Sequence, residues 1–134
     1  MHYRRFGLVL GVLLIVASTA MVTGCGAKRQ LVSIRVTPDN LTITGEGLIV
    51  NYRAIGSYIN PVETRDITSQ VAWASTAPQI ISIDPNTGVA VSGFGCGTNI
   101  GITATHYYNQ AAKTGAAIVG TAGMNVVQPA GVCQ

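Results

Sequence analysis

Apolar and polar residues alternate in short runs along most of this chain. Such alternation predicts β-strands that turn one face to a core. In the clearest run, Val71, Trp73 and Ser75 share one face, and Trp73 is the only tryptophan of the chain. A tryptophan offers a small β domain more apolar surface than most other side chains. We therefore expect Trp73 to lie buried at the centre of the fold, with neighbouring strands packed around it.

Similar runs predict the remaining strands. In the first strand we expect Val32, Ile34 and Val36 to share the inner face, and in the third Val50, Tyr52 and Ala54. Stretches rich in Pro, Gly and Asx residues separate the runs and predict turns. The polar stretch 57–64 is interpreted as a connection, and 107–115 as a loop or irregular hairpin. The strands other than that of Trp73 are expected at 31–37, 41–43, 48–56, 80–83, 89–92, 98–105 and 116–127.

Seven or eight short strands at this spacing predict an all-β sandwich, with antiparallel strands in two sheets. The chain has 134 residues, of which about 100 carry the strand pattern. That length is enough for two small sheets with a common core. We expect one domain at 31–127, followed by an irregular tail at 128–134.

The first 24 residues have the features of a targeting segment. His2, Arg4 and Arg5 precede an apolar run from 6 to 22, and small residues follow it. The run is shorter than the roughly 20 apolar residues of a membrane-spanning helix. We interpret 1–24 as a signal peptide that is removed from the mature protein.

The end of this segment resembles the lipobox of bacterial lipoproteins. In Val22-Thr23-Gly24-Cys25 a hydrophobic residue and two small ones precede a cysteine. The resemblance implies that Cys25 carries a diacylglycerol and becomes the first mature residue, with 25–30 as a lipidated cysteine and short tether. It also implies a lipid-anchored envelope protein, and Gly26, which is not acidic, permits export to the outer membrane. The alternative is an ordinary secretory signal whose Cys25 remains a thiol.

Removal of the signal peptide leaves the mature chain nearly neutral. Arg4 and Arg5 leave with it, so six of the eight basic residues remain against five acids, a net charge of +1. No basic stripe remains that would favour nucleic-acid binding. Lys28 and Arg29 follow Cys25 directly, where they can contact lipid headgroups.

The sequence contains no recognisable catalytic or cofactor-binding motif. His106 is the single histidine of the mature chain and follows a predicted strand, which favours a surface position. No serine or cysteine elbow suggests a hydrolase triad. Glu63 and Asp66 lie three residues apart, and nothing else supports a glycosidase pair. Asp84 stands in a Pro-Asn-Gly turn, where capping of the turn is the better interpretation than cation binding. We expect no enzyme activity, no cofactor and no metal site.

The order of the strand motifs resembles the bacterial Ig-like group 2 family. The resemblance covers 31–127, nearly the whole mature chain. It implies an Ig-like β-sandwich on the bacterial surface or in the envelope, without enzymatic activity. The matching pieces are VSIRVTP at 32–38, YRAIG at 52–56, DIT at 66–68, VAWAS at 71–75, ISI at 81–83, NTGV at 86–89 and GTNIGITA at 97–104.

Two functions are compatible with this resemblance. The first is a membrane-anchored module for binding or adhesion, with an unidentified protein or polysaccharide ligand. The second is a structural or accessory lipoprotein that supports an envelope protein complex. Relatives often carry several modules, whereas this chain has one, which argues against a spacer in a long stalk.

Cys96 and Cys133 are not part of the family pattern. In an Ig-like sandwich the last two strands are antiparallel neighbours, so the start of one lies beside the finish of the other. Cys96 precedes the strand at 98–105, and Cys133 lies six residues past the strand that ends at Val127. We predict a disulfide between them, because exported proteins enter an oxidising environment in which disulfides persist. The alternatives are two free thiols, or a bond from Cys133 to another protein.

The tyrosine pair Tyr107 and Tyr108 is the closest feature to a recognition surface. Aromatic side chains beside the amides of Asn109 and Gln110 can stack on sugars or peptides at low entropic cost. We mark this stretch as a candidate recognition loop. The alternative is that both tyrosines are half-buried and pack under their own loop.

Overall fold

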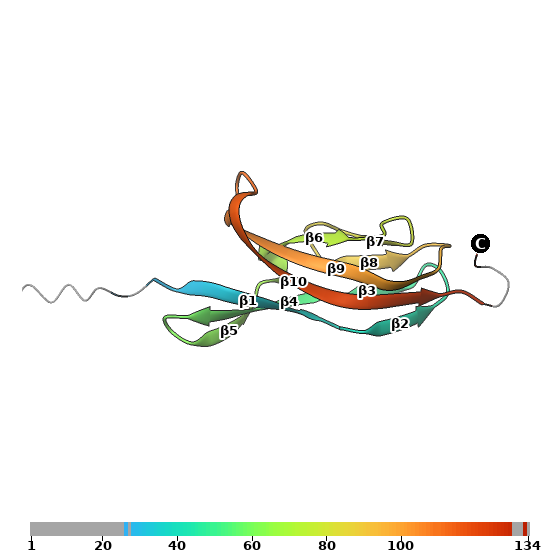
Figure 1. Cartoon of the computed structure of the whole chain (residues 1–134), viewed down its shortest axis with the longest axis horizontal. Helices are drawn as coiled ribbons and strands as arrows, with labels where there is room; N and C mark the ends of the chain where they lie inside the picture. The colour runs from blue at the N-terminus through green and yellow to red at the C-terminus, as the bar shows by residue number, and fades with distance from the viewer. Residues whose placement is uncertain (1–25, 27, 130–132, 134) are drawn as a thin grey trace, which may run out of the picture.

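The computed structural model describes residues 26, 28–129 and 133, and this part of the chain is almost entirely β (Figure 1). The expected all-β, sandwich-like architecture is confirmed. The proposed signal peptide at 1–24 and the lipid-attachment residue Cys25 lie outside the described residues. The strands are β1 (Gln30–Thr37), β2 (Leu41–Thr44), β3 (Ile49–Asn51), β4 (Arg53–Ile59), β5 (Glu63–Asp66), β6 (Ala72–Ser75), β7 (Ile81–Ile83), β8 (Val89–Ser92), β9 (Gly97–Asn109) and β10 (Thr114–Val127), with one 3₁₀ turn, η1 (Thr68–Gln70).

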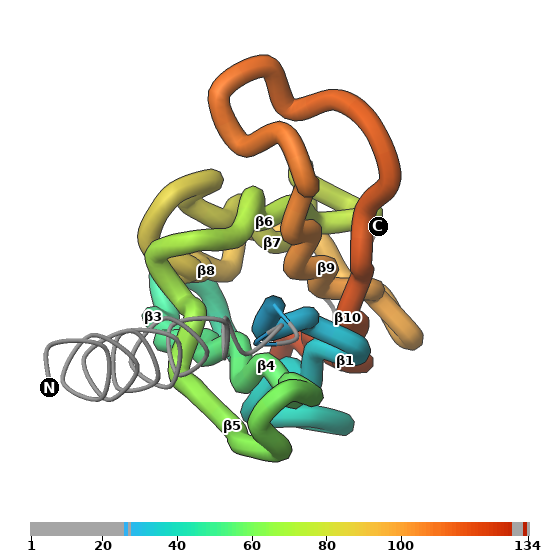
Figure 2. Tube along the Cα trace, turned by 90° about the vertical axis from the view of Figure 1, so that its left-hand side faces the viewer, coloured from blue at the N-terminus to red at the C-terminus, as the bar shows by residue number. Residues whose placement is uncertain are grey.

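Three sheets, rather than the expected two, surround one core (Figure 2). A four-stranded sheet has the order β2-β10-β9-β6, and two three-stranded sheets have the orders β1-β4-β5 and β3-β8-β7. Only Tyr52 separates β3 from β4, and its N–H donates to the carbonyl oxygen of Gly88 at 2.9 Å. One stretch of chain therefore joins the two smaller sheets.

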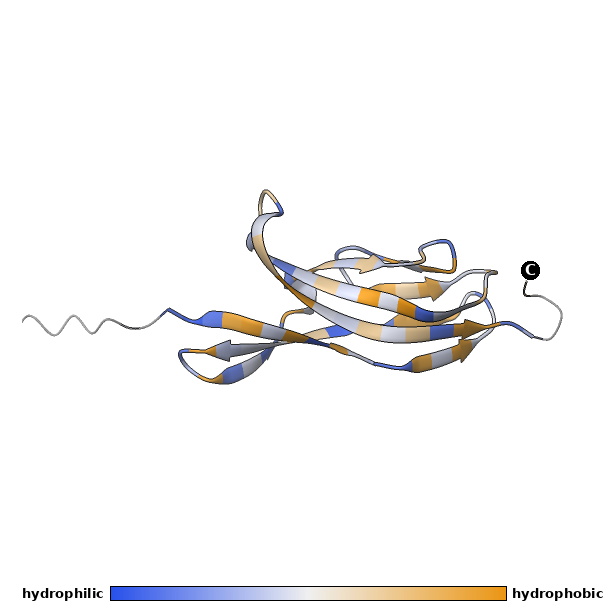
Figure 3. Ribbon diagram, in the orientation of Figure 1, coloured by the Kyte–Doolittle hydropathy of each residue, from blue (hydrophilic) through white to orange (hydrophobic). Residues whose placement is uncertain are grey.

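Trp73 lies in the core, as predicted, with 3% of its surface exposed. Its indole Nε1 donates to the carbonyl oxygen of Thr68 at 3.0 Å, and the ring of Tyr52 lies 6.3 Å away between centroids. The inward positions expected for Val50, Tyr52 and Ala54 are also confirmed. Apolar and polar positions are interleaved along the long strands that enclose these residues (Figure 3).

The first strand corrects one expected inward position. Ile34 and Val36 are buried, but Val32 is 46% exposed and Leu31 takes its place in the core. The register between β1 and β4 shifts between Leu31 and Ser33. A β-bulge adds one residue to a strand and reverses the facing of the residues on one side of it. Simple alternation therefore gives the wrong face for Val32.

The single strand expected at 48–56 is divided at Tyr52 into β3 and β4. The connection expected at 57–64 is also wrong, because β4 continues to Ile59 and pairs with β5 in a hairpin. Both halves of the divided strand keep their alternate residues inward, so the change of sheet leaves the alternation of the sequence intact.

The last two strands are longer than predicted, with 13 residues in β9 and 14 in β10. The expected loop at 107–115 is mostly strand, and only 110–113 form the turn. The described part contains ten strands rather than seven or eight, and β2 pairs with β10 in parallel. The remaining strand pairs are antiparallel, as expected.

Candidate recognition surfaces

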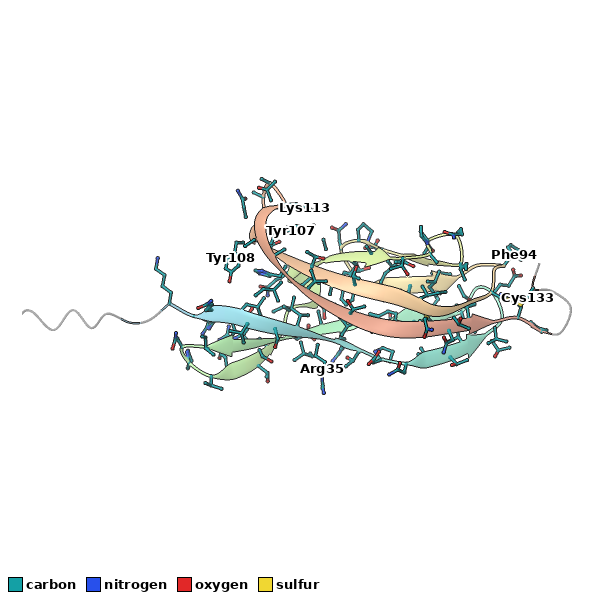
Figure 4. The ribbon with its side chains drawn as sticks, viewed as in Figure 1. Arg35, Phe94, Tyr107, Tyr108, Lys113 and Cys133 are labelled. Carbon is teal, nitrogen blue, oxygen red and sulfur yellow. A yellow bond between two sulfur atoms is a disulfide. The ribbon has the colours of Figure 1, made fainter. Side chains whose placement is uncertain are left out.

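The structure has two ends with different chemistry. The described chain begins at one end, where β1 starts, and Phe94 and Cys133 lie at the other (Figure 4). Tyr107, Tyr108 and Lys113 belong to the β9–β10 hairpin on the side where the chain begins. We call the end where β1 starts the chain-start end, and the end with Phe94 and Cys133 the disulfide end.

The disulfide end is held together by the predicted bond between Cys96 and Cys133, whose Cα atoms are 5.7 Å apart. At the start of the tail, the side-chain Nε2 of Gln128 donates to the carbonyl oxygens of Gly93 at 2.9 Å and Gly95 at 3.4 Å. Gln128 is buried despite its polarity because these backbone acceptors satisfy it. The residues that follow β10 are therefore fastened to the corner that precedes β9.

A shallow surface depression lies at this end, beside Phe94. Phe94 is 76% exposed, a large fraction for a phenylalanine. Alternation does not mark Phe94, because a residue between Gly93 and Gly95 belongs to no alternating run. The signal that was available is an aromatic residue in a glycine-rich corner, where little chain can cover it. The depression is lined by Gly45, Glu46, Phe94, Gln128 and Pro129.

The predicted recognition residues Tyr107 and Tyr108 lie in β9 rather than in a loop. Tyr107 is half-buried, whereas Tyr108 is 57% exposed. By alternation Tyr108 shares the inner face of β9 with Ile102 and Ala104, which are buried. It is exposed because the facing layer does not extend this far along the hairpin. The two tyrosines therefore point to opposite faces, and a ligand cannot stack on both rings at once.

The carboxylate of Asp84 caps its turn, as expected. Its Oδ1 accepts from the N–H groups of Asn86 at 2.9 Å and Thr87 at 2.8 Å, which lowers the pKa of Asp84. In the same way, Oδ1 of Asp66 accepts from the hydroxyl of Thr68 at 2.6 Å and from its N–H at 2.9 Å, and the pKa of Asp66 is lowered. Both carboxylates are engaged by the backbone of their own turns.

Glu63 is engaged by two guanidinium groups. Its Oε1 lies 2.5 Å from Nε of Arg29 and 2.9 Å from Nε of Arg65. Glu63 and Asp66 are three residues apart on β5, so they point to opposite faces. The structure thus does not bring this pair together for glycoside hydrolysis. The Glu63 contacts instead hold Arg29, the residue before β1, against the β4–β5 hairpin.

The described residues offer few other groups for chemistry. His106 is half-buried on β9, next to Tyr107. Within 26, 28–129 and 133, no three His, Cys, Asp or Glu side chains are placed to hold a metal ion. In the same part of the chain, no helix has the length and apolarity to cross a membrane.

No protein-family model matches the chain, and no curated protein matches its sequence. The resemblance to the Ig-like group 2 family therefore remains a prediction from the motifs of this sequence.

Proposed function

We propose that this protein is a lipid-anchored protein of the bacterial cell envelope with one Ig-like module for binding or adhesion. Cys25 is the attachment residue, and Gly26 permits sorting to the outer membrane. The lipobox-like ending of 1–24 supports the anchor, and the motif order in 31–127, folded as a β-sandwich, supports the module. A binding role is favoured over a catalytic one because Glu63, Asp66 and Asp84 are each engaged by local partners.

One observation carries this proposal. The chain enters the module at one end, and the exposed Phe94 and the disulfide lie at the other (Figure 4). An anchor at Cys25 would hold the chain-start end at the membrane and present the disulfide end outward. Aromatic side chains, phenylalanine included, are enriched in the cores of protein interfaces relative to the rest of the protein surface. We therefore assign recognition to the disulfide end rather than to Tyr107 and Tyr108.

The strand edges favour binding over the accessory role. Partners that add a strand to a sheet need an accessible edge of some length. The edge strands β2, β5 and β6 have four residues each, and the edge strands β3 and β7 have three each. The longer edge strand β1 is approached by β10, because Gly120 lies against Ile34. An added strand would have little backbone to pair with at these edges.

The recognition assignment is tested by crosslinking pull-down of the native lipoprotein, together with a glycan-binding screen. We expect Phe94→Ala to reduce capture at least tenfold, because it removes the exposed ring without disturbing the core. Val119→Ala is the matched control, since Val119 is exposed on β10 and does not line the depression. Equal capture by the wild type and Phe94→Ala would contradict the assignment.

The anchor is tested separately by intact-mass measurement of protein extracted from membranes. We expect a mature chain that begins at Cys25 and carries two or three acyl chains, because a single chain anchors only weakly. A different mature N-terminus, or a free thiol at Cys25, would contradict the anchor without bearing on Phe94.

A further inference from the structure

The chain-start end combines positive charge with exposed apolar side chains. Three segments form it: the residues that precede β1, the β4–β5 hairpin tip at 59–65 and the β9–β10 hairpin tip at 107–115. Their basic side chains are Lys28, Arg29, Arg65 and Lys113, and their single acidic side chain is Glu63. We call this surface the basic end.

The three segments lie around the point where the chain enters. Ile59, the last residue of β4, pairs with Gln30, the first residue of β1, so the β4–β5 tip flanks the chain start. The β9–β10 tip lies on the opposite side of β1 (Figure 2). The basic end therefore has two protruding tips with the chain entry between them, and one plane can touch both.

Each tip places an apolar or aromatic side chain in solvent. Val62 is 88% exposed in the β4–β5 turn, the largest exposure among the large hydrophobic residues that the structure describes as exposed. Tyr108 continues the inner face of β9 past the end of the core and lies on the side of the hairpin toward the chain start (Figure 4). Tyrosine is enriched where proteins meet the headgroup level of a bilayer, since its ring is apolar and its hydroxyl polar.

The chain-start residues are held against this surface. Oε1 of Glu63 contacts Nε of Arg29 and Nε of Arg65, which fixes Arg29 beside the β4–β5 hairpin. Cys25 precedes Arg29 by four positions in the sequence, a separation of about 14 Å at full extension. An anchor at Cys25 would bring the basic end within contact of the bilayer.

We propose that the basic end is a membrane-contact surface for anionic phospholipid. Lys28 and Lys113 contact lipid phosphates, and Val62 and Tyr108 enter the headgroup region on either side of the tether. The match is one of charge and polarity, because a basic rim with exposed apolar tips is complementary to an anionic interface. Its orientation rests on the proposed anchor, but the surface itself belongs to the folded module.

The test uses the unacylated module from Gly26 to Gln134. Every described strand and buried residue lies between Gln30 and Gln128, so this part contains the entire fold. Flotation is measured with vesicles of phosphatidylglycerol and phosphatidylethanolamine in equal parts, and with vesicles of phosphatidylcholine alone. We expect binding to the anionic vesicles that weakens with added salt, and at least tenfold weaker binding to the neutral ones.

Substitutions locate the surface. A basic residue beside an anionic membrane contributes about a factor of five in affinity. We expect K28Q and K113Q each to weaken anionic binding about fivefold, and V62S to weaken it by a similar factor. R35Q is the matched control, because Arg35 is an exposed base on the side of the molecule, away from both tips (Figure 4). I49S is the matched control for V62S, because Ile49 is 66% exposed on β3 and belongs to neither tip.

Three outcomes would overturn the proposal. The first is equal binding to anionic and neutral vesicles. The second is a loss of anionic binding in R35Q as large as that in K113Q, which would indicate a general charge attraction between protein and vesicle rather than a defined surface. The third is binding to peptidoglycan sacculi but not to vesicles, which would assign the surface to a polysaccharide. Because the module tested here has no lipid, failure of this proposal and failure of acylation at Cys25 are measured independently.

Discussion

At the scale of single residues, Trp73 connects parts of the chain that are distant in sequence. Its indole N–H donates to Thr68, and its backbone N–H donates to the carbonyl oxygen of Pro85 at 3.0 Å. Gly88 completes the site. Its φ of +74° favours glycine, and a Cβ there would lie 2.8 Å from the indole ring. The tryptophan thus fits a space that the turn before β8 leaves free.

Trp73→Ala is expected to lower the free energy of unfolding by about 3–5 kcal/mol, the usual cost of removing a buried aromatic ring. A loss of that size is comparable with the whole stability of many small domains. Thermal unfolding followed by far-UV circular dichroism measures it. Phe94→Ala is the control, since it removes an exposed ring and is expected to change stability by less than about 0.5 kcal/mol. Similar melting of both variants would refute the burial of Trp73.

Tyr52 provides a prediction at alkaline pH. Burial, and to a smaller extent the charge of Asp39, raises the pKa of Tyr52 from 10.0 to about 12. The folded state favours the neutral phenol, so this contribution to stability is complete below pH 10 and is lost as the pH rises toward 12. Tyr52→Phe should remove the step near pH 12 from the tyrosinate absorbance titration. An unchanged late step in Tyr52→Phe would show that another tyrosine is the buried one.

At the scale of elements, β1 and β10 approach closely without being hydrogen-bonded neighbours in a sheet. Gly120 on β10 makes this close approach possible. A Cβ at this position would lie 2.5 Å from the backbone oxygen of Ile34, and neither backbone can move without shifting its strand. From the sequence alone, Gly120 is a glycine inside a strand, and such a glycine usually weakens the strand.

Gly120→Ala is therefore expected to lower the free energy of unfolding by about 1–3 kcal/mol, as overpacking does. Gly123→Ala on the same strand is the matched control. Its nearest neighbour is the side-chain Oδ1 of Asn40 at 3.2 Å, which can rotate away. Urea unfolding midpoints distinguish the two, and equal midpoints would argue against a close crossing of β1 over β10.

The disulfide joins the tail to the corner before β9 across 37 positions of sequence. The chain-entropy model gives about 3–4 kcal/mol for a loop of that length. We expect the Cys96→Ser/Cys133→Ser variant to melt at a correspondingly lower temperature and to be insensitive to reductant. The wild type should fall to the same value when reduced. If non-reducing peptide mapping recovers the two cysteines unlinked, the bond is absent.

The elements also show where alternation suffices and where it does not. Strands with a buried face are predicted near their true positions, because their apolar residues recur with period two. The strand β5 has no buried residue, and its first half falls in a segment predicted as a connection. The misplacement of Val32 and the division at Tyr52 have another cause. A bulge and a change of sheet are determined by hydrogen-bond pairing with strands that are distant in sequence. The apolar-polar alternation of one strand does not reveal that pairing.

At the scale of the whole molecule, the proposed orientation depends on the chain-start end and the disulfide end rather than on any one residue. The pairing of Cys96 with Cys133 could be predicted, since it follows from the order of the last two strands. The exposure of Phe94 and Val62 could not, because both lie in turns whose cover depends on the other segments around them. The opposite placement of chain start and disulfide emerges only from the assembled sheets, and the proposed orientation depends on it.

The shared core predicts that the three sheets unfold together. Ala54, Trp73 and Ile81 come from different sheets and lie in one cluster of buried residues. Tyr52 adds a second link, since its hydroxyl lies 3.3 Å from Sδ of Met124. Trp73 is the only tryptophan, so its fluorescence reports the core alone, whereas far-UV circular dichroism reports all strands. We expect both signals to follow one transition, with equal calorimetric and van't Hoff enthalpies. Reduction of the disulfide should shift that transition without splitting it. A fluorescence change that precedes the loss of β-structure would show that the two smaller sheets separate from the four-stranded one, and that Tyr52 is a hinge rather than a link.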